Sequence, residues 1–200
     1  MFYEGSVAGR YSYTYNGDFN RDGQFNDLIY IPKDGEYTAA NFVTLTTTGT
    51  NGGTWTPAEQ LDLFTTYINQ DAYLSKHKGE YAERNGATMP WRNQVDLRIV
   101  QDIFTNLGGK NNTLQFTLDI FNLGNFLNSD WGVYKTVNAS AILVPVTLPT
   151  QGVSPVPTFR IATFANQPLA GGTTGYPGTY RNNNSYASTY YMHVGLRYSF

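Results

Sequence analysis

The last fifteen residues of the chain alternate between apolar side chains and side chains that are mainly polar or small. The apolar positions are aromatic at both ends and aliphatic in the middle: Tyr190, Met192, Val194, Leu196, Tyr198 and Phe200. A two-residue period is that of a β-strand with two unlike faces. Aromatic ends around an aliphatic centre are typical of a strand that crosses a lipid bilayer. The alternative interpretation is the C-terminal strand of a soluble sandwich.

The composition favours a membrane barrel over a soluble enzyme. Charged residues make up only 14% of the 200 residues and aromatic residues 16%, whereas a soluble domain has about 25% charged residues. No apolar run reaches the ~20 residues of a transmembrane helix, which excludes a helical span. The absence of cysteine excludes disulfides, thiolate metal sites and cysteine nucleophiles. The net charge of -2 gives no support to nucleic-acid binding.

Three earlier segments alternate in the same way. The four expected strands are residues 2–15, 91–104, 113–126 and 187–200. The apolar positions of the first strand include Tyr11, Tyr13 and Tyr15. In the second strand, Asp96 and Arg98 alternate with aliphatic residues, and on a lipid face near mid-strand the arginine alone would cost about 2–4 kcal/mol. The apolar faces are therefore expected to contact lipid and the charged faces to line a lumen.

The pair Gly108-Gly109 separates the second and third strands and predicts a two-residue hairpin turn. A turn centred there places Ile99 opposite Leu118 and Arg98 opposite Asp119. Apolar side chains then pair with apolar ones, and the two charges form an ion pair inside the lumen. A slip by one residue would pair side chains of unlike faces.

The other two connections, residues 16–90 and 127–185, are long, whereas residues 105–112 form a short turn. Barrels have short periplasmic turns and long extracellular loops, so the short connection is expected in the periplasm. The second long loop contains two β-like segments, 141–147 and 158–164, which are expected to form an additional hairpin.

One helix is expected in the first long loop. Thr56 and Glu59 have the spacing of a capping box, and Pro57 between them suits the first helical position. An apolar stripe with helical spacing then continues to about Gln70, which predicts a helix over 57–70.

The predicted fold is all-β: an antiparallel transmembrane β-barrel segment over residues 1–200, with long extracellular loops and one short loop helix. Four strands leave two sheet edges whose unpaired backbone groups would cost several kcal/mol each in lipid, so the chain must be part of a larger barrel. Residues 1–13 also lack the basic and apolar regions of a signal peptide. The chain is therefore expected to be the tail of a longer polypeptide or a truncated gene product.

Several motifs resemble one family. Residues 119–126 (DIFNLGNF) resemble the penultimate barrel strand of TonB-dependent outer-membrane receptors, and nearly the whole chain resembles the C-terminal portion of Oar-like receptors. The other matching stretches are residues 18–23, 26–32, 73–86 and 128–132. The chain also ends like the assembly signal of outer-membrane barrels, with the matching residues His193, Gly195, Tyr198 and Phe200.

The resemblance implies a location in the cell outer membrane, as the last four strands of a twenty-two-strand barrel around a plug. It implies a receptor that takes up a nutrient; the substrate is not readable from the chain. The implied partners are outer-membrane lipid, the rest of the barrel and plug, the barrel-assembly machinery and, through an N-terminal part outside this sequence, the TonB system. Arg98 and Asp119 would brace the plug or each other.

One segment has the oxygen spacing of the first half of a calcium-binding loop, with Gly23 at the sixth position. The candidate ligands are the side chains of Asp18, Asn20 and Asp22, the backbone carbonyl of Gln24, and a side-chain oxygen of Asn26 or Asp27. Ile29 stands where such a loop has its bidentate glutamate, so a lower calcium affinity is expected. The alternative is a turn whose Asp and Asn side chains accept hydrogen bonds from their own backbone.

No catalytic constellation is recognisable, and the chain is predicted not to be an enzyme. Any combination of its two histidines, His77 and His193, with a serine and an aspartate into a catalytic triad would be arbitrary. Two other functions remain open: a secreted, calcium-stabilised β-rich module for adhesion or carbohydrate binding, and a non-functional receptor fragment.

Overall fold

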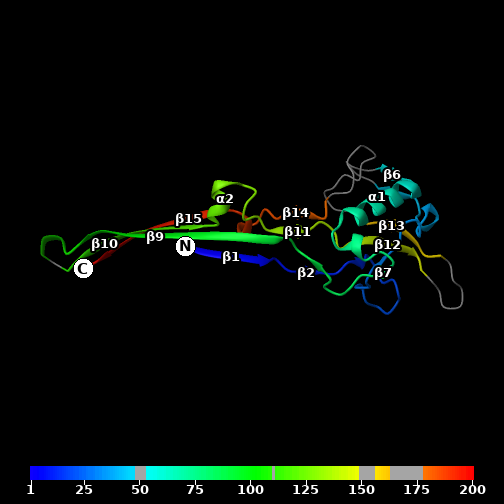
Figure 1. Ribbon diagram of the computed structural model, residues 1–200, viewed down its shortest axis with the longest axis horizontal. Coiled ribbons are helices and arrows are strands. Elements are labelled where there is room, and N and C mark those ends of the chain that lie inside the picture. The colour runs from blue at the N-terminus through cyan, green and yellow to red at the C-terminus, as the bar shows by residue number, and fades with distance from the viewer. Residues whose placement is uncertain (48–52, 110, 149–155, 163–177) are drawn as a thin grey trace. The chain divides into compact units, whose positions relative to one another are not determined.

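The structure is a computed structural model that describes residues 1–47, 53–109, 111–148, 156–162 and 178–200. These residues form fifteen strands and two α-helices, so the described chain is mostly β (Figure 1). Neither of the two helices is long and apolar enough to cross a membrane. The chain divides into two compact units, which are described separately.

The first unit, the sheet unit, contains Met1–Ala8, Pro90–Thr136 and Asn182–Phe200. It holds one antiparallel sheet with the strand order β1-β9-β10-β15. The strands are β1 (Phe2–Val7), β9 (Trp91–Thr105), β10 (Thr113–Phe121) and β15 (Tyr191–Ser199). The expectation of an open antiparallel sheet from these four segments is confirmed, and closure into a barrel stays a prediction.

The register between β9 and β10 is the predicted one, with Ile99 opposite Leu118 and Arg98 opposite Asp119. The two-residue turn that led to this register is wrong. β9 ends at Thr105 and β10 begins at Thr113, so seven residues connect the two strands. Next to the connection Leu114 pairs with Phe104, and a shift by one residue between Leu114 and Gln115 restores the predicted register for the rest of the hairpin. Residue 110 of the expected turn lies outside the described residues.

The longer connection has a local cause. Asn106, Gly108 and Gly109 all have positive φ angles, from 56° to 73°, and the Asn106 amide donates to the Asn112 carbonyl at 2.6 Å. Glycine and asparagine adopt the left-handed region most readily, so this stretch leaves the strand conformation earlier than a centred two-residue turn would require.

The strand expected over residues 2–15 is also shorter, since β1 ends at Val7. The chain continues into the second unit through β2 (Arg10–Tyr11) and β3 (Thr14–Tyr15), and Tyr13 and Tyr15 are fully buried there. Their assignment to the lipid face is therefore wrong. A two-residue alternation also fits a strand that packs one face on a protein core.

Two other strand boundaries differ from the prediction. The strand expected over residues 113–126 ends at Phe121, and helix α2 (Leu123–Leu127) follows it. Asn122 between them has φ 55° and ψ 52°, the left-handed conformation, which a strand cannot continue through. The strand expected over 187–200 begins only at Tyr191.

The second unit, the core unit, contains Gly9–Met89 and Val137–Arg181. In it β12 (Ala141–Thr147) pairs antiparallel with β13 (Thr158–Ile161) and parallel with β3. The hairpin expected in this region is confirmed, and residues 163 and 164 of its second strand lie outside the described residues. The long connections of the sheet thus build a hydrophobic core of their own.

Helix α1 (Pro57–Gln70) has the predicted bounds. The Glu59 amide donates to the Thr56 hydroxyl at 3.3 Å, and the Thr56 amide donates to the Glu59 carboxylate at 2.8 Å, so the expected capping box forms. Phe64 and Tyr67 on its inner face are buried in the core.

The remaining elements are short. They are β4 (Tyr30–Ile31) with β7 (Glu80–Tyr81), β5 (Leu45–Thr47) with β6 (Gly53–Trp55), β2 with β8 (Ala87–Thr88), β11 (Lys135–Val137) with β14 (Tyr180–Asn182), and four 3-10 turns over Ala39–Asn41, Leu74–Lys76, Leu107–Gly109 and Tyr186–Ser188.

Candidate functional site

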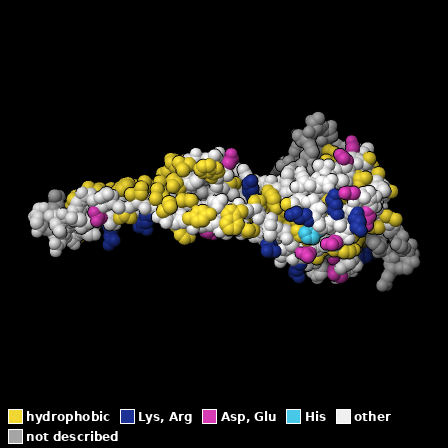
Figure 2. Space-filling view, viewed as in Figure 1, with side chains coloured by type: hydrophobic (Ala, Val, Ile, Leu, Met, Phe, Trp, Pro, Cys, Tyr) yellow, Lys and Arg dark blue, Asp and Glu magenta, His cyan; other side chains and the backbone are white. Residues whose placement is uncertain are grey.

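One face of the four-stranded sheet is mainly apolar, with Asn93 and Gln101 of β9 as polar positions on it. We call the following residues, which the register places on one side, the apolar face: Tyr3, Val7, Trp91, Val95, Leu97, Ile99, Leu114, Phe116, Leu118, Ile120, Met192, Val194, Leu196 and Tyr198. Its members on β15 are largely exposed, with Val194 at 68% and Leu196 at 69%. Hydrophobic side chains gather over these strands in Figure 2. Monomeric soluble proteins rarely leave so continuous an apolar surface exposed.

The extent of the apolar face along β15 fits a bilayer. From Tyr190 to Phe200 the strand rises by about 33 Å at ~3.3 Å per residue. At a strand tilt of about 40°, this becomes about 25 Å along the membrane normal, the height of the apolar band of outer-membrane barrels. In a bilayer, the two aromatic ends would then lie at the two boundaries of the hydrocarbon.

The opposite face of the sheet carries the charges. Arg98 Nε lies 3.4 Å from Asp119 Oδ1, so the expected ion pair forms. His193 lies opposite Asp119 on β15, which makes these three residues one row across the sheet. A second polar row consists of Asp102, Gln115 and Arg197. That this polar face lines a lumen stays a prediction.

Sequence reasoning did not anticipate aromatic side chains on the polar face. The ring of Phe121 stacks on Tyr191 with 4.5 Å between the ring centroids and an angle of 15°, and it contacts the His193 ring edge-on at 5.5 Å. The sequence signal was available, because Tyr191 interrupts the polar set of the last strand.

The residues of the expected assembly signal lie on an edge strand. His193 and Gly195 point to the polar face, Tyr198 belongs to the apolar face, and Phe200 follows β15 and is almost fully exposed. Gly195 pairs with Thr117, where an added Cβ would meet the threonine Cβ at an ordinary 3.8 Å. The four side chains thus make no common site, and their role as a signal stays a prediction.

The expected calcium loop is closed by its own backbone. Asp18 accepts hydrogen bonds from the Asp22 and Gly23 amides at 3.1 and 2.9 Å, and Asp22 Oδ1 accepts one from the Gln24 amide at 2.8 Å. Asp27 Oδ2 accepts from the Phe19 and Asn20 amides at 2.6 and 3.2 Å, and Asn26 is exposed.

This pattern is that of the Asx-turn alternative. Within the described residues, no three Asp, Glu, His or Cys side chains are grouped to hold a metal ion. The carboxylates of Asp18, Asp22 and Asp27 each accept hydrogen bonds from backbone amides of the loop. Only part of their oxygen lone pairs is therefore left for a metal ion. Calcium binding stays a prediction.

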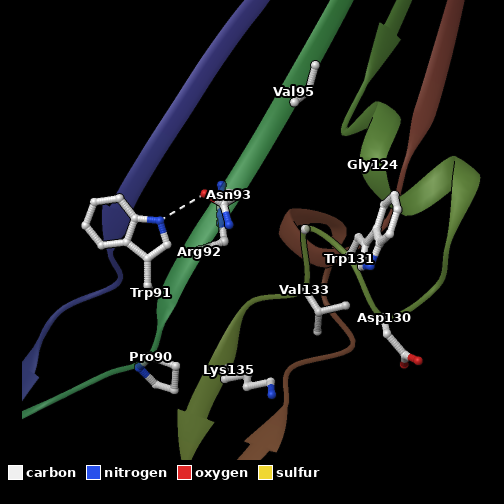
Figure 3. Close-up of a pocket in the computed structure, with 11 residues that line it drawn as sticks. Pro90, Trp91, Arg92, Asn93, Val95, Gly124, Asp130, Trp131, Val133 and Lys135 are labelled. Atoms are coloured by element: carbon white, nitrogen blue, oxygen red, sulfur yellow. Dashed lines mark hydrogen bonds between the residues drawn. The ribbon is translucent and has the colours of Figure 1, made fainter.

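A cavity of about 380 Å³ in the sheet unit lies against the start of β9 (Figure 3). Residues Trp91 to Asp96 pair with β1, and pairing with β10 begins only at Leu97. On that side the first part of β9 therefore has no strand partner among the described residues. The cavity lies beside this part of β9 and is lined among others by Trp91, Arg92, Asn93, Trp131, Gly132 and Lys135.

Asn122 holds the chain that walls this cavity. Its backbone amide donates to Asp96 Oδ1 at 2.9 Å, and its side-chain Nδ2 donates to the Gly132 carbonyl at 3.1 Å. These bonds turn the chain from β10 into α2 and fasten the following loop. Sequence reasoning missed the cavity because its walls meet through contacts between residues far apart in the chain; the only local signal was the motif at 119–125.

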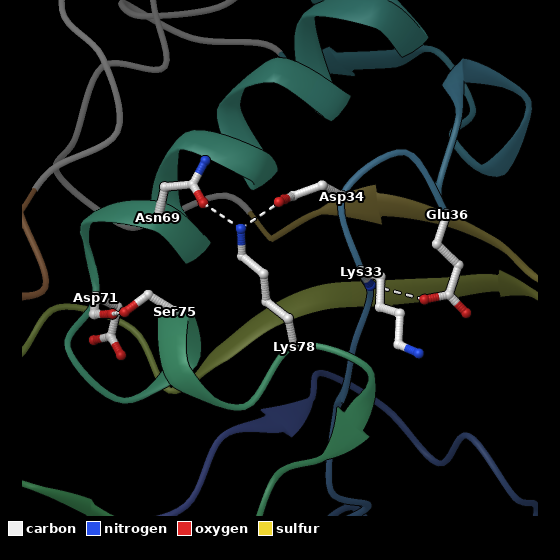
Figure 4. Close-up of polar contacts among 7 residues, drawn as sticks. All are labelled: Lys33, Asp34, Glu36, Asn69, Asp71, Ser75 and Lys78. Atoms are coloured by element: carbon white, nitrogen blue, oxygen red, sulfur yellow. Dashed lines mark hydrogen bonds and ion pairs between the residues drawn. The ribbon is translucent and has the colours of Figure 1, made fainter.

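Lys78 joins two segments of the core unit through an ion pair and a hydrogen bond. Lys78 Nζ lies 2.6 Å from Asp34 Oδ1 and donates to Asn69 Oδ1 at 2.7 Å, which joins the end of α1 to the segment after β4 (Figure 4). Glu36 accepts hydrogen bonds from the Lys33 amide and the Tyr30 hydroxyl, which lower the pKa of its carboxyl group. These contacts fasten segments of the core unit to one another.

Buried tyrosines form a polar centre within the core unit. The Tyr13 hydroxyl donates to Asp71 Oδ2 at 2.7 Å, and Asp71 Oδ1 accepts from the Tyr73 and Leu74 amides at 2.9 and 2.8 Å. Burial raises the pKa of Tyr13 far above its ordinary value and that of Tyr15 to about 12. The buried carboxylate therefore joins the C-cap of α1 to the segment between β2 and β3.

The two histidines belong to different units. His77 stacks on Tyr73 at 4.1 Å between ring centroids, and its Nδ1 lies 2.8 Å from the Tyr73 carbonyl oxygen. His193 lies on β15.

Comparison with protein-family models, with curated proteins and with solved structures finds no match to this chain. A function must therefore be argued from the residues themselves.

Proposed function

We propose that this chain forms the last four strands of a twenty-two-strand outer-membrane barrel, the C-terminal part of an Oar-like TonB-dependent receptor that takes up a nutrient. The observation that carries the proposal is the exposed apolar face with aromatic residues at both ends. Leaving side chains such as Val194 and Leu196 in water forgoes about 1.5–3 kcal/mol each at full exposure. Contact with the hydrocarbon of a bilayer would remove this free-energy cost for every side chain of the apolar face.

The edges of the sheet support a partial barrel. β1 and β15 are its outer strands, and each offers one row of backbone groups to a further strand. In lipid each unpaired group costs several kcal/mol, so the rest of the barrel would pair with both edges. The polar face, with the Arg98–Asp119 pair, would face the plug.

The core unit would then be the extracellular part, built from the two long connections. Its own hydrophobic core gives those connections a fixed shape, as a substrate vestibule requires. Calcium at residues 18–27 would stabilise this unit. The remaining partners of the proposal are the barrel-assembly machinery and the TonB system.

Site-directed spin labelling tests the proposal, because the chain has no cysteine of its own. We would place single cysteines at Val194 and Leu196 on the apolar face, and at His193 and Arg197 on the polar face, in the full chain with lipid vesicles. The proposal predicts that labels at 194 and 196 collide with oxygen, which concentrates in hydrocarbon, and are shielded from a water-soluble nickel complex. Labels at 193 and 197 should show the reverse.

Equal access of nickel to all four positions would exclude a lipid-facing sheet. A chain that stays soluble without detergent and does not bind vesicles would instead favour the secreted module. A receptor fragment without function would show the same alternating access of oxygen and nickel to the labels. It would give no nutrient uptake after it is joined to the rest of its barrel.

A further inference from the structure

We infer that the cavity beside β9 binds the phosphate head group of an anionic lipid. The inference rests on the proposed function, because it needs the apolar face to lie in a bilayer. The cavity volume of about 380 Å³ suits a small polar group. Three features of its walls indicate which group that is.

The first feature is charge. Arg92 and Lys135 both line the cavity, and neither has a carboxylate within 4 Å among the described residues. Arg92 pairs with Ser6 and so lies on the polar face, next to Trp91 of the apolar face, and both residues line the cavity at the edge of β9 that no described strand covers. Among the described residues its guanidinium donates to the neutral side chain of Gln94, which leaves its other donors for a ligand. The one acidic lining residue is Asp130, whose carboxylate points away from Arg92 in Figure 3. Two cations against one carboxylate favour an anion, and arginine suits the oxygen geometry of phosphate.

The second feature is the position of the cavity along the strands. Trp91 is the first residue of β9 and pairs with Val7, so it marks one end of the apolar face. Trp131 lies on the other wall of the cavity and is exposed. Tryptophan is enriched where hydrocarbon meets the head groups. The cavity is therefore placed at the depth of lipid phosphates.

The third feature is an apolar surface next to the cavity. Gly124 in its wall belongs to α2, where Phe126 and Leu127 are 47% and 67% exposed. The Phe126 ring contacts Tyr190 edge-on at 5.1 Å, and Tyr190 is the first aromatic of the last strand's apolar positions. A free phosphate ion would use only the cations, whereas an amphiphile would use the cations and this apolar surface together. This continuity favours lipid.

The test titrates the full chain, in a zwitterionic detergent, with dodecyl phosphate and follows the bound amphiphile by native mass spectrometry. Arg92→Gln and Lys135→Gln should each raise the midpoint concentration about tenfold, the effect of losing one charge-assisted hydrogen bond. Arg197→Gln is the matched control, since it removes one cation from the opposite end of the same sheet, and it should leave the midpoint unchanged. Arg92→Lys keeps the charge and should recover part of the affinity.

Equal weakening by Arg197→Gln would overturn the inference, because it would show attraction by net charge alone. Inorganic phosphate that competes at the same concentration as dodecyl phosphate would also overturn it, since the site would then take the free ion. If the spin labels show a lipid-facing sheet and dodecyl phosphate still binds without regard to Arg92 and Lys135, this inference fails and the proposed function stands.

Discussion

Replacing Val194 with arginine places a charge at the centre of the apolar face. Val194 lies four residues after Tyr190 and six before Phe200, the two aromatic ends of its strand. Four residue steps are about 13 Å along the strand, or about 10 Å below the bilayer boundary at a tilt of about 40°. The side chain would thus lie close to the middle of the hydrocarbon.

Arginine at that depth costs about 2–4 kcal/mol, which is a factor of about 30 to 1,000 in the partition coefficient. In water the same change is nearly free, because Val194 is 68% exposed and surface substitutions stay within about 0.5 kcal/mol. The difference between these two costs distinguishes a lipid-facing sheet from a soluble one.

The assay is the partition of the full chain between buffer and phosphatidylcholine vesicles, measured by sedimentation of the vesicles. His193→Arg is the control, since His193 directly precedes Val194 but lies on the polar face. We expect Val194→Arg to lower the partition coefficient by at least 30-fold and His193→Arg to change it less than threefold. Equal effects of the two variants would refute the assignment of the faces.

Three further predictions concern the loops. Gly132→Ala should destabilise the sheet unit by about 2–3 kcal/mol in urea unfolding, because Gly132 has φ 63° and an added Cβ would collide with Asn122 Oδ1; Gly124→Ala, without these constraints, should cost under 1 kcal/mol. The raised pKa of Tyr15, about 12, means that its contribution to stability is complete below pH 10 and is lost as pH rises through 12; absorbance at 295 nm should then show buried tyrosines ionising only as the core unit unfolds, and free titration near pH 10 in the folded chain would contradict this. Calcium should raise the thermal midpoint of the core unit and lose that effect in Asp22→Ala, whereas equal midpoints with and without calcium would leave the Asx turn as the whole explanation.

Elements that depend on neighbouring residues were predictable. Helix α1 begins where expected because its capping box needs only Thr56 and Glu59, three residues apart. Helix α2 was missed for the opposite reason. Its first turn depends on a hydrogen bond from the Asn122 amide to Asp96, 26 residues away, and without that partner the motif at 119–125 looks like the end of a strand.

The β9–β10 hairpin shows why the register was predictable although the turn was not. Side chains of one face must pair with side chains of the same face, and this condition acts over the full length of both strands. The turn involves few residues, so a register shift next to Gln115 can absorb its extra length without moving the Arg98–Asp119 pair. The Arg98–Asp119 pairing was therefore predicted correctly, whereas the cavity beside β9 was not foreseen.

Tyr11, Tyr13 and Tyr15 show what alternation alone does not reveal, and also which signal would have corrected it. Three successive tyrosines on one face of a strand span about 13 Å, so an aromatic girdle at the bilayer boundary would hold only part of them. A tyrosine below that boundary would bury its hydroxyl in hydrocarbon without a partner, at a cost of at least 1–3 kcal/mol. A protein core can supply that partner, as it does for Tyr13 through Asp71 at 2.7 Å. A run of alternating tyrosines therefore favours a protein core that contains hydrogen-bond acceptors, whereas the alternating aliphatic residues of the last strand, with aromatics at both ends, are the basis of the proposed contact with lipid.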